Sequence, residues 1–176
     1  GLHGQHPGRQ ARVAVDRGFD LGQYYSMVAC GAVSCGGIGA IFGNGSGSVN
    51  YGALLHCYFR ACTSHGLQPW SNGEQNNWSG CEFSDNGGSG VNAGGAFRAA
   101  WCLFYDNAAD GLQATPSAAA TVVAAVNCTF EGNTSDGVDI TITNIRSASF
   151  TNCAFTNNGA YGAKASATLP PGFVDY

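Results

Sequence analysis

Short stretches in which apolar and polar residues alternate recur along the chain. Each begins at a cysteine, as in residues 81–83 (Cys-Glu-Phe), passes through an Asn/Gly-rich segment, and resumes as an apolar-x-small triplet such as residues 91–93 (Val-Asn-Ala). A period of two indicates β-strands, and Asn and Gly favour tight turns. The pattern therefore predicts pairs of short strands that are joined by turns.

The pattern is an internal repeat. Four copies share Cys at the start, Phe at position +2, Asn at +5 and Gly at +9, and they are residues 81–90, 102–111, 128–137 and 153–162. Two upstream copies start at Cys30 and Cys57 and carry Cys35 and Cys62 in place of the asparagine. Successive starting cysteines are 27, 24, 21, 26 and 25 residues apart. This period is shorter than that of helical solenoids, and the Leu-x-x-Leu-x-Leu signature of leucine-rich repeats is absent.

A repeat of short strands with this period predicts a coil of strands stacked on itself, in which like residues lie on like. We expect an all-β parallel β-helix of about six to seven rungs over residues 29–168. Residues 1–28 would form a lead-in, either a partial rung or a linker, and residues 169–176 a C-terminal tail. The internal columns are expected to contain Cys30, Cys57, Cys81, Cys102, Cys128, Cys153, Phe59, Phe83, Phe104, Phe130 and Phe155, and the turn ladder Asn86, Asn107, Asn133 and Asn158.

The eight cysteines fit this coil better than a zinc site or a disulfide scaffold, since their spacing is that of the repeat. Buried free cysteine behaves as a small hydrophobic residue, so we expect reduced, structural thiols. Cys35 and Cys62 occupy the same turn column on adjacent rungs, within the separation that a disulfide requires. They are the one pair expected to form a disulfide in an oxidising compartment.

The repeat resembles the right-handed parallel β-helix of pectate-lyase-like enzymes and of bacteriophage tailspikes and tail fibres, over residues 30–165. The resemblance implies parallel association about a long axis, as a homo-oligomer, most simply a trimer, or as part of a larger assembly. It also implies an extracellular or virion-surface location. It carries over no catalytic residue, because Arg60, Arg98, Arg146 and Lys164 match no motif of the enzymes.

The amino-acid composition excludes some classes of function. The chain has 176 residues, of which 44% are hydrophobic and only 10% are charged, with 7 Lys+Arg against 11 Asp+Glu. This is one domain with enough apolar surface for a core. It has no basic stripe to neutralise phosphates, so nucleic acid is not an expected partner. No apolar run is long enough for a membrane span.

Four turn aspartates are the candidate acidic residues, Asp85 and Asp106 at position +4 and Asp110 and Asp136 at position +8. Two carboxylates one rung apart repel each other, which raises the pKa of one and suits a general acid beside a base or nucleophile. Such a pair is also able to hold Ca²⁺, and no other metal or cofactor is expected. Aspartates in turns commonly cap backbone N–H groups instead, so catalytic and structural roles both stay open.

Aromatic residues at outward or loop positions suit stacking against sugars. The polar stretch 68–79 has the composition of a binding loop on a rigid scaffold, although packing against the coil or another chain is an equal alternative. The residues expected to bind a ligand are Trp70, Asn72, Glu74, Trp78, Trp101 and Tyr105.

The first functional hypothesis is a displayed module of a tail fibre or spike that binds a host-surface glycan or serves as a rigid shaft. The start at Gly1 rather than Met is expected of an excised or processed piece. A polysaccharide lyase or glycoside hydrolase with its groove on the four aspartates is the alternative, although we lean towards no enzymatic activity. A structural filament or adhesin subunit without a ligand is the third hypothesis.

Overall fold

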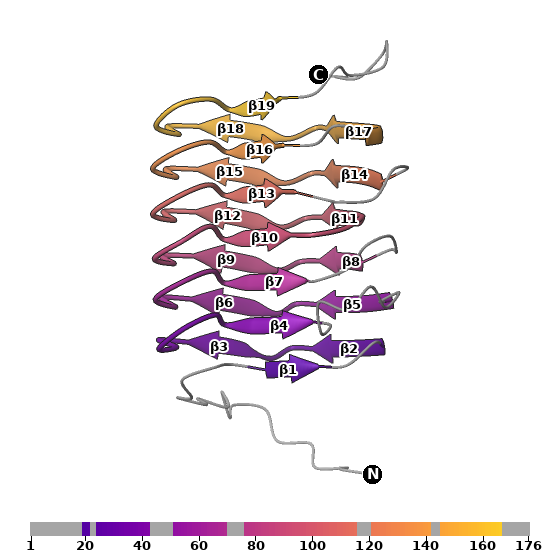
Figure 1. The fold of residues 1–176 in the computed structure, drawn as a ribbon, viewed down its shortest axis with the longest axis vertical. Coiled ribbons are helices and arrows are strands. Elements are labelled where there is room, and N and C mark those ends of the chain that lie inside the picture. Colours follow the sequence, from indigo (N-terminus) through magenta and orange to yellow (C-terminus); the bar gives the residue numbers. More distant parts are fainter. Residues whose placement is uncertain are drawn as a thin grey trace.

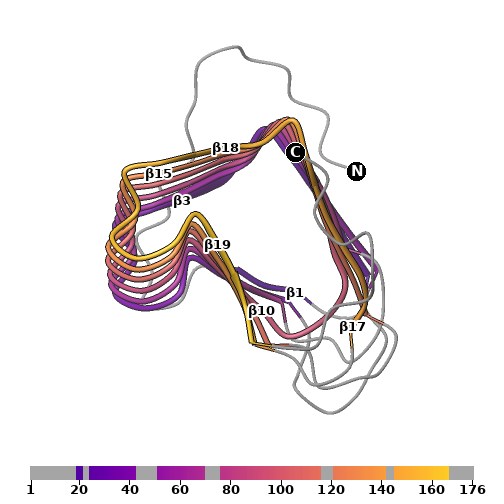
Figure 2. The same cartoon turned by 90° about the horizontal axis from the view of Figure 1, so that it is seen from above.

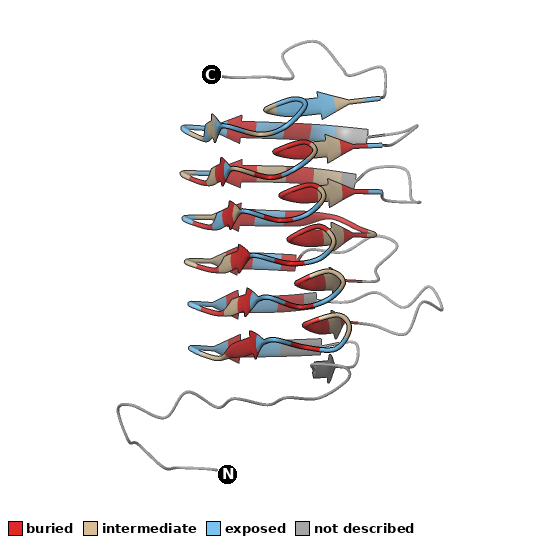
Figure 3. Cartoon of the chain, turned by 90° about the vertical axis from the view of Figure 1, so that its left-hand side faces the viewer, coloured by how far each residue is buried: buried red, intermediate tan, exposed pale blue. Residues whose placement is uncertain are grey.

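The computed structural model describes residues 19–21, 24–42, 51–69, 76–115, 121–141 and 145–166. Within these ranges every regular element is a β-strand, and nineteen short strands wind into a tall coil (Figure 1). In the middle rungs, side chains inside the coil are buried, whereas most of those on the outer faces are half-buried or exposed (Figure 3). The expected all-β parallel solenoid is therefore confirmed.

The strands form three parallel sheets, one on each side of the coil (Figure 2). Sheet A contains β1 (Phe19–Leu21), β4 (Ala40–Phe42), β7 (Leu67–Pro69), β10 (Val91–Ala93), β13 (Leu112–Ala114), β16 (Val138–Ile140) and β19 (Ala163–Ala165). Sheet B contains β2 (Tyr24–Val28), β5 (Tyr51–Leu55), β8 (Asn76–Ser79), β11 (Phe97–Ala100), β14 (Thr121–Val126) and β17 (Ile145–Thr151). Sheet C contains β3 (Gly31–Val33), β6 (Tyr58–Arg60), β9 (Glu82–Ser84), β12 (Leu103–Tyr105), β15 (Thr129–Glu131) and β18 (Ala154–Thr156).

Each rung runs from sheet B through sheet C to sheet A, and the described strands make six such rungs preceded by β1. Neighbouring rungs are in register, so that Leu103 pairs with Glu82 on one side and with Thr129 on the other. Strands β1 and β2 lie in the predicted lead-in, and both are paired, with β4 and β5. The coil therefore begins before the predicted boundary at residue 29, as the partial-rung alternative requires. The predicted tail, residues 169–176, lies outside the described residues.

The core consists of the expected stacked columns. Phe83, Phe104 and Phe130 are fully buried, and their rings stack at centroid distances of 5.0 and 4.7 Å with interplanar angles of 14° and 8°. Cysteines of the starting column are buried in the four middle rungs, whereas Cys30 and Cys153 in the outermost rungs are half-buried. In-register stacking explains both columns, because each side chain packs on its equivalent one rung away.

The predicted asparagine ladder is present in the turn after sheet C. Asn86 Nδ2 donates to Asn107 Oδ1, Asn107 Nδ2 to Asn133 Oδ1, and Asn133 Nδ2 to Asn158 Oδ1, each at 2.9 Å. Each amide also donates to the backbone carbonyl of a phenylalanine one rung back, as Asn107 does to Phe83 O at 3.1 Å. The ladder thus satisfies buried polar groups while it joins the rungs.

The ladder asparagines do not themselves take the left-handed backbone conformation of this turn. The preceding residue takes it, with φ of 56° at Asp85 and 54° at Asp106. The chain therefore reverses one residue earlier, which turns the asparagine side chain inward to the phenylalanine carbonyl. A second left-handed column marks the corner between sheets B and C, and it contains Ala29, His56, Gly80, Trp101, Asn127 and Asn152.

We predict that Asn107→Ala destabilises the protein by roughly 2–4 kcal/mol, because it leaves the Asn86 amide and the Phe83 carbonyl without their partners inside the coil. Urea unfolding followed by circular dichroism measures this change. Asn77, which is exposed on sheet B, is the matched control, and Asn77→Ala should stay within about 0.5 kcal/mol of the parent. Equal effects of the two variants would contradict a structural ladder.

We also predict two classes of thiol. Cys35, Cys57, Cys62, Cys81, Cys102 and Cys128 are buried, whereas Cys30 and Cys153 are half-buried. In the native reduced protein, an aromatic disulfide reagent should label Cys30 and Cys153 first, and the other six only in denaturant. Mass spectrometry of the labelled peptides identifies the sites. Fast labelling of Cys102 in the native state would contradict the inward column.

Candidate functional site

The outer surface of sheet C carries a hydrogen-bonded network centred on Glu82. Its Oε2 pairs with the Arg60 guanidinium, and its Oε1 accepts hydrogen bonds from Tyr105 Oη at 2.5 Å and from Ser84 Oγ at 3.2 Å. The Arg60 guanidinium lies over the Tyr58 ring, 5.6 Å from its centroid. Since the five residues come from β6, β9 and β12, the network holds three consecutive rungs of this surface in a fixed arrangement.

The electrostatics of Glu82 follow from this arrangement. Burial alone would raise its pKa, but the hydrogen bond from Tyr105 and the Arg60 guanidinium outweigh burial, and the net effect lowers the pKa of Glu82 below its usual value. The same hydrogen bond raises the pKa of Tyr105. At neutral pH the network therefore contains a carboxylate, a guanidinium and a protonated phenol, so it combines hydrogen-bond donors with hydrogen-bond acceptors.

Trp101 lies at the corner where sheet B meets sheet C, at the start of the turn that leads into β12. Its side chain is 66% exposed, and its backbone is left-handed with φ of 58°. Leu103 on sheet C and Val126 on sheet B are exposed on either side of it. In the next rung back, Gly80 leaves room for His56, because a Cβ at residue 80 would lie 2.5 Å from His56 Nδ1. The corner thus presents an exposed apolar surface of Trp101, Leu103 and Val126, and Leu103 pairs with Glu82 of the network.

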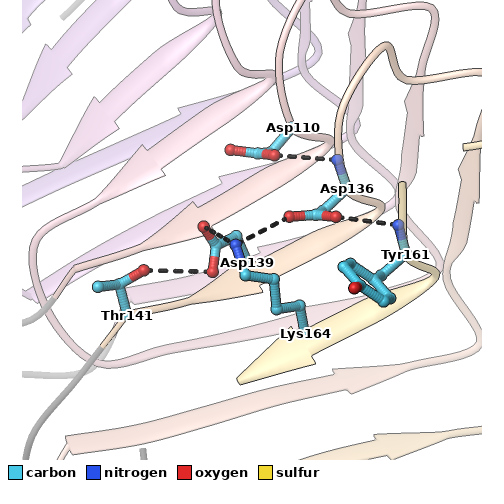
Figure 4. Close-up of polar contacts among 6 residues, drawn as sticks. All are labelled: Asp110, Asp136, Asp139, Thr141, Tyr161 and Lys164. Atoms are coloured by element: carbon cyan, nitrogen blue, oxygen red, sulfur yellow. Dashed lines mark hydrogen bonds and ion pairs between the residues drawn. The ribbon is translucent and has the colours of Figure 1, made fainter. Parts of the chain in front are cut away.

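Asp110 and Asp136 lie on the far side of the turn, next to sheet A, and both are buried (5% and 2% exposed). Asp110 Oδ1 accepts the Asp136 backbone N–H at 3.0 Å, and Asp136 Oδ1 accepts the Tyr161 N–H at 2.9 Å (Figure 4). Lys164 Nζ lies 3.5 Å from Asp136 Oδ2 and 3.4 Å from Asp139 Oδ2. The two contacts to the Asp136 and Tyr161 N–H groups are the backbone capping that we weighed against catalysis.

His65 holds the equivalent place two rungs before Asp110 and also caps the backbone. Its Nδ1 accepts the Ser89 N–H at 3.0 Å, which requires an unprotonated Nδ1. Burial lowers the pKa of His65, so burial and the hydrogen bond both favour the neutral ring. This turn column contains His65, Ser89, Asp110 and Asp136. Three of its side chains, those of His65, Asp110 and Asp136, accept a backbone N–H from the next rung.

Asp85 and Asp106 lie on the opposite side of the same turn, at the corner that follows sheet C, and both are exposed. Gly132, in the same column, accommodates Asp106, because a Cβ at residue 132 would lie 2.4 Å from Asp106 Oδ1. The four candidate aspartates therefore divide into an exposed pair and a buried pair with different contacts. In the described part of the chain, no group of three His, Cys, Asp or Glu side chains is placed to hold a metal ion, and a calcium site stays a prediction.

The aromatic predictions have mixed outcomes. Trp101 and Tyr105 lie at the edge and on the surface of sheet C, as expected of outward residues. Trp78 was expected at the surface, but it points into the core, is 1% exposed, and stacks on Phe97 at 4.9 Å. The stretch 68–79 is not one loop, since its ends belong to β7 and β8. Trp70, Asn72 and Glu74 lie outside the described residues.

Sequence reasoning did not identify Glu82 as part of a site. The signal was available, because Glu82 lies at the outward position +1 of its repeat while Arg60 and Tyr105 lie at +3 of the repeats before and after it. In-register stacking places Arg60, Glu82 and Tyr105 on one diagonal of the outer face of sheet C. Whether their side chains are long enough to touch across the rungs cannot be read from the repeat alone.

Cys35 and Cys62 are both buried and both free. The backbone N–H of Thr63 donates to Cys35 O at 2.9 Å, so that the two turns lie one above the other. Burial raises the pKa of Cys62 to about 12, which keeps this thiol protonated at neutral pH. The disulfide between them stays a prediction for an oxidising compartment.

Residues 27–169 match the family model described as the right handed beta helix region. This match covers most of the chain, so the protein belongs to the right-handed β-helix family. No curated protein and no solved structure matched the chain. Among the described residues there is no helix with the length and hydrophobicity that a membrane crossing needs.

We predict a specific pH dependence of stability from Glu82. Its folded pKa lies below the usual value of 4.5, so its contribution is present above pH 4.5 and is lost as the pH falls through the folded pKa. Urea midpoints measured from pH 6 to about pH 3 should therefore fall more steeply for the parent than for Glu82→Gln. Parallel curves for the two proteins would show that the network does not stabilise the folded state.

Proposed function

We propose that this β-helix is a displayed module that binds a glycan at the corner of Trp101 and on the adjoining outer face of sheet C. The observation that carries the proposal is Trp101 itself, an exposed tryptophan on a left-handed backbone. A bulky side chain is disfavoured in that conformation. Its exposure also means that it gains little from burial in this chain.

Other members of the corner column show what folding alone favours. Gly80, Asn127 and Asn152 occupy the same position, and Gly and Asn are the residues that adopt the left-handed conformation most readily. Ala29 and His56 also belong to this column, and Trp101 is its bulkiest member, so it departs furthest from the local conformational preference. Strained positions of this kind cluster at binding and catalytic sites, and an exposed indole offers the flat apolar surface that the C–H face of a sugar ring contacts.

The Glu82 network supplies the polar half of such a site. Arg60, Glu82 and Tyr105 are held by contacts to one another, so little side-chain entropy is lost when they bind sugar hydroxyls. A tryptophan platform beside an ordered set of donors and acceptors is the usual combination of an apolar surface with a few placed polar groups.

Display on a larger particle is the second part of the proposal. A parallel coil is a stiff, quasi-one-dimensional scaffold, which suits a tail fibre or spike at an extracellular or virion surface. Assembly as a homo-oligomer, most simply a trimer, would repeat the binding corner around the axis and raise the avidity for a repetitive polysaccharide.

A polysaccharide-cleaving enzyme is the second candidate, and it is favoured by the exposure of Asp85 and Asp106 on consecutive rungs. Incubation with the glycans that bind, followed by measurement of reducing ends and of unsaturated uronate absorbance, tests for hydrolase or lyase activity. Turnover that Asp106→Asn abolishes without loss of binding would favour the enzyme over the binder.

We predict that Trp101→Asn weakens binding to a glycan identified on an array of bacterial surface polysaccharides by at least about tenfold. Because Asn fits the left-handed position, the same change should leave the free energy of unfolding unchanged or raise it by about 1 kcal/mol. Calorimetric titration and urea unfolding measure the two effects.

The matched control is Tyr161→Ala, which removes an exposed aromatic side chain (61%) next to sheet A and should leave binding unchanged. If Trp101→Asn binds as well as the parent, or if it destabilises the fold, the proposal that Trp101 serves binding is refuted.

A further inference from the structure

We infer that the glycan recognised at the Trp101 corner is uncharged where it contacts the protein, and that acidic sugars are discriminated against there. This inference rests on the proposed function and names its ligand class. It is carried by the distribution of charge over the outer face of sheet C and the two corners that border it.

Carboxylates predominate on this surface. Glu82 and Glu131 lie on sheet C itself, and Asp85 and Asp106 follow it at the next corner. Arg60 is the one Lys or Arg among the described residues of sheet C and its two corners, and its guanidinium is already paired with Glu82.

Positive charges elsewhere do not balance this surface. Lys164 is engaged by Asp136 and Asp139 next to sheet A, and Arg98 is exposed on sheet B, in the strand β11 that ends at the Trp101 corner. A uronate or sialate carboxylate that lies across the outer face of sheet C would therefore approach Glu131, Asp85 and Asp106, and the one cation on that face is already paired. Exclusion by such unpaired like charges is a common source of specificity.

Uncharged sugars meet no such penalty. A hexose stacked on Trp101 presents hydroxyl groups, which both donate and accept, to the carboxylate of Glu82, the phenol of Tyr105 and the remaining N–H groups of Arg60. Hydroxyl donors to a carboxylate form charge-assisted hydrogen bonds. Glu82 thus provides a strong acceptor for a neutral sugar, on the same surface whose unpaired carboxylates repel an acidic one.

The test compares each acidic polysaccharide with its own carboxyl-reduced form, in which every uronic acid has become the neutral hexose while the linkages are kept. Bacterial surface polysaccharides, native and carboxyl-reduced, are printed as pairs and probed with the full chain at pH 8. We expect neutral and carboxyl-reduced forms to bind at least tenfold more tightly than their acidic parents.

The matched variant is the double substitution Asp85→Asn and Asp106→Asn, which removes two charges while keeping side chains that tolerate the left-handed backbone. It should reduce the preference for the carboxyl-reduced form at least threefold, and added salt should reduce it in the parent. Equal or tighter binding of the acidic parents would overturn the inference while leaving glycan binding intact. A preference unchanged in the double variant would overturn its electrostatic basis.

Absence of binding to every polysaccharide by the folded parent, with folding verified by circular dichroism, would refute the proposed function and this inference together. Binding that survives Trp101→Asn with the preference intact would place the glycan elsewhere on the coil, and it would refute the assignment to this corner.

Discussion

The hydrogen bond from one rung to the next is the interaction on which the rest of this structure depends. Backbone pairing in three parallel sheets and the ladder from Asn86 to Asn158 fix every rung in register with its neighbours. Register in turn places Phe on Phe and Cys on Cys, so that the core is built from one-dimensional stacks. Each buried asparagine bonds the rungs on both sides, which makes the ladder cooperative and costly to interrupt.

This constraint leaves the outward positions free to differ between rungs. Inward positions must accept an identical neighbour, whereas the outer face of sheet C carries Tyr58, Glu82, Leu103 and Thr129 in one continuous column. The scaffold therefore allows side chains on the outer face to vary from rung to rung while the inner stacks stay the same. The Glu82 network shows how side chains from three rungs combine into a surface that no single repeat contains.

The two left-handed corners link conformation to function. At the corner after sheet C, short polar residues such as Asp85 and Asp106 adopt φ above 50° at little cost. At the corner between sheets B and C, most rungs likewise carry small residues or asparagine, and Trp101 departs from this preference. The departure lies next to the ordered polar network, and this proximity is what makes the corner a candidate site rather than an isolated irregularity.

The repeat by itself determined the fold class, the inner Cys and Phe columns and the asparagine ladder, because in-register stacking turns a sequence period directly into contacts. It did not determine which turn residue is left-handed, since the inward direction of the asparagine side chain moves the reversal one residue earlier. Trp78 illustrates the limit, because its outward or inward direction depends on where β8 begins, and the varying spacing between repeats hides that point in the sequence. Only the tertiary structure brought Arg60, Glu82 and Tyr105 together, buried Asp110 and Asp136 while exposing Asp85 and Asp106, and placed Trp101 beside the network. These outcomes depend on side-chain reach across rungs and on the direction of the turn, which a one-dimensional period does not encode.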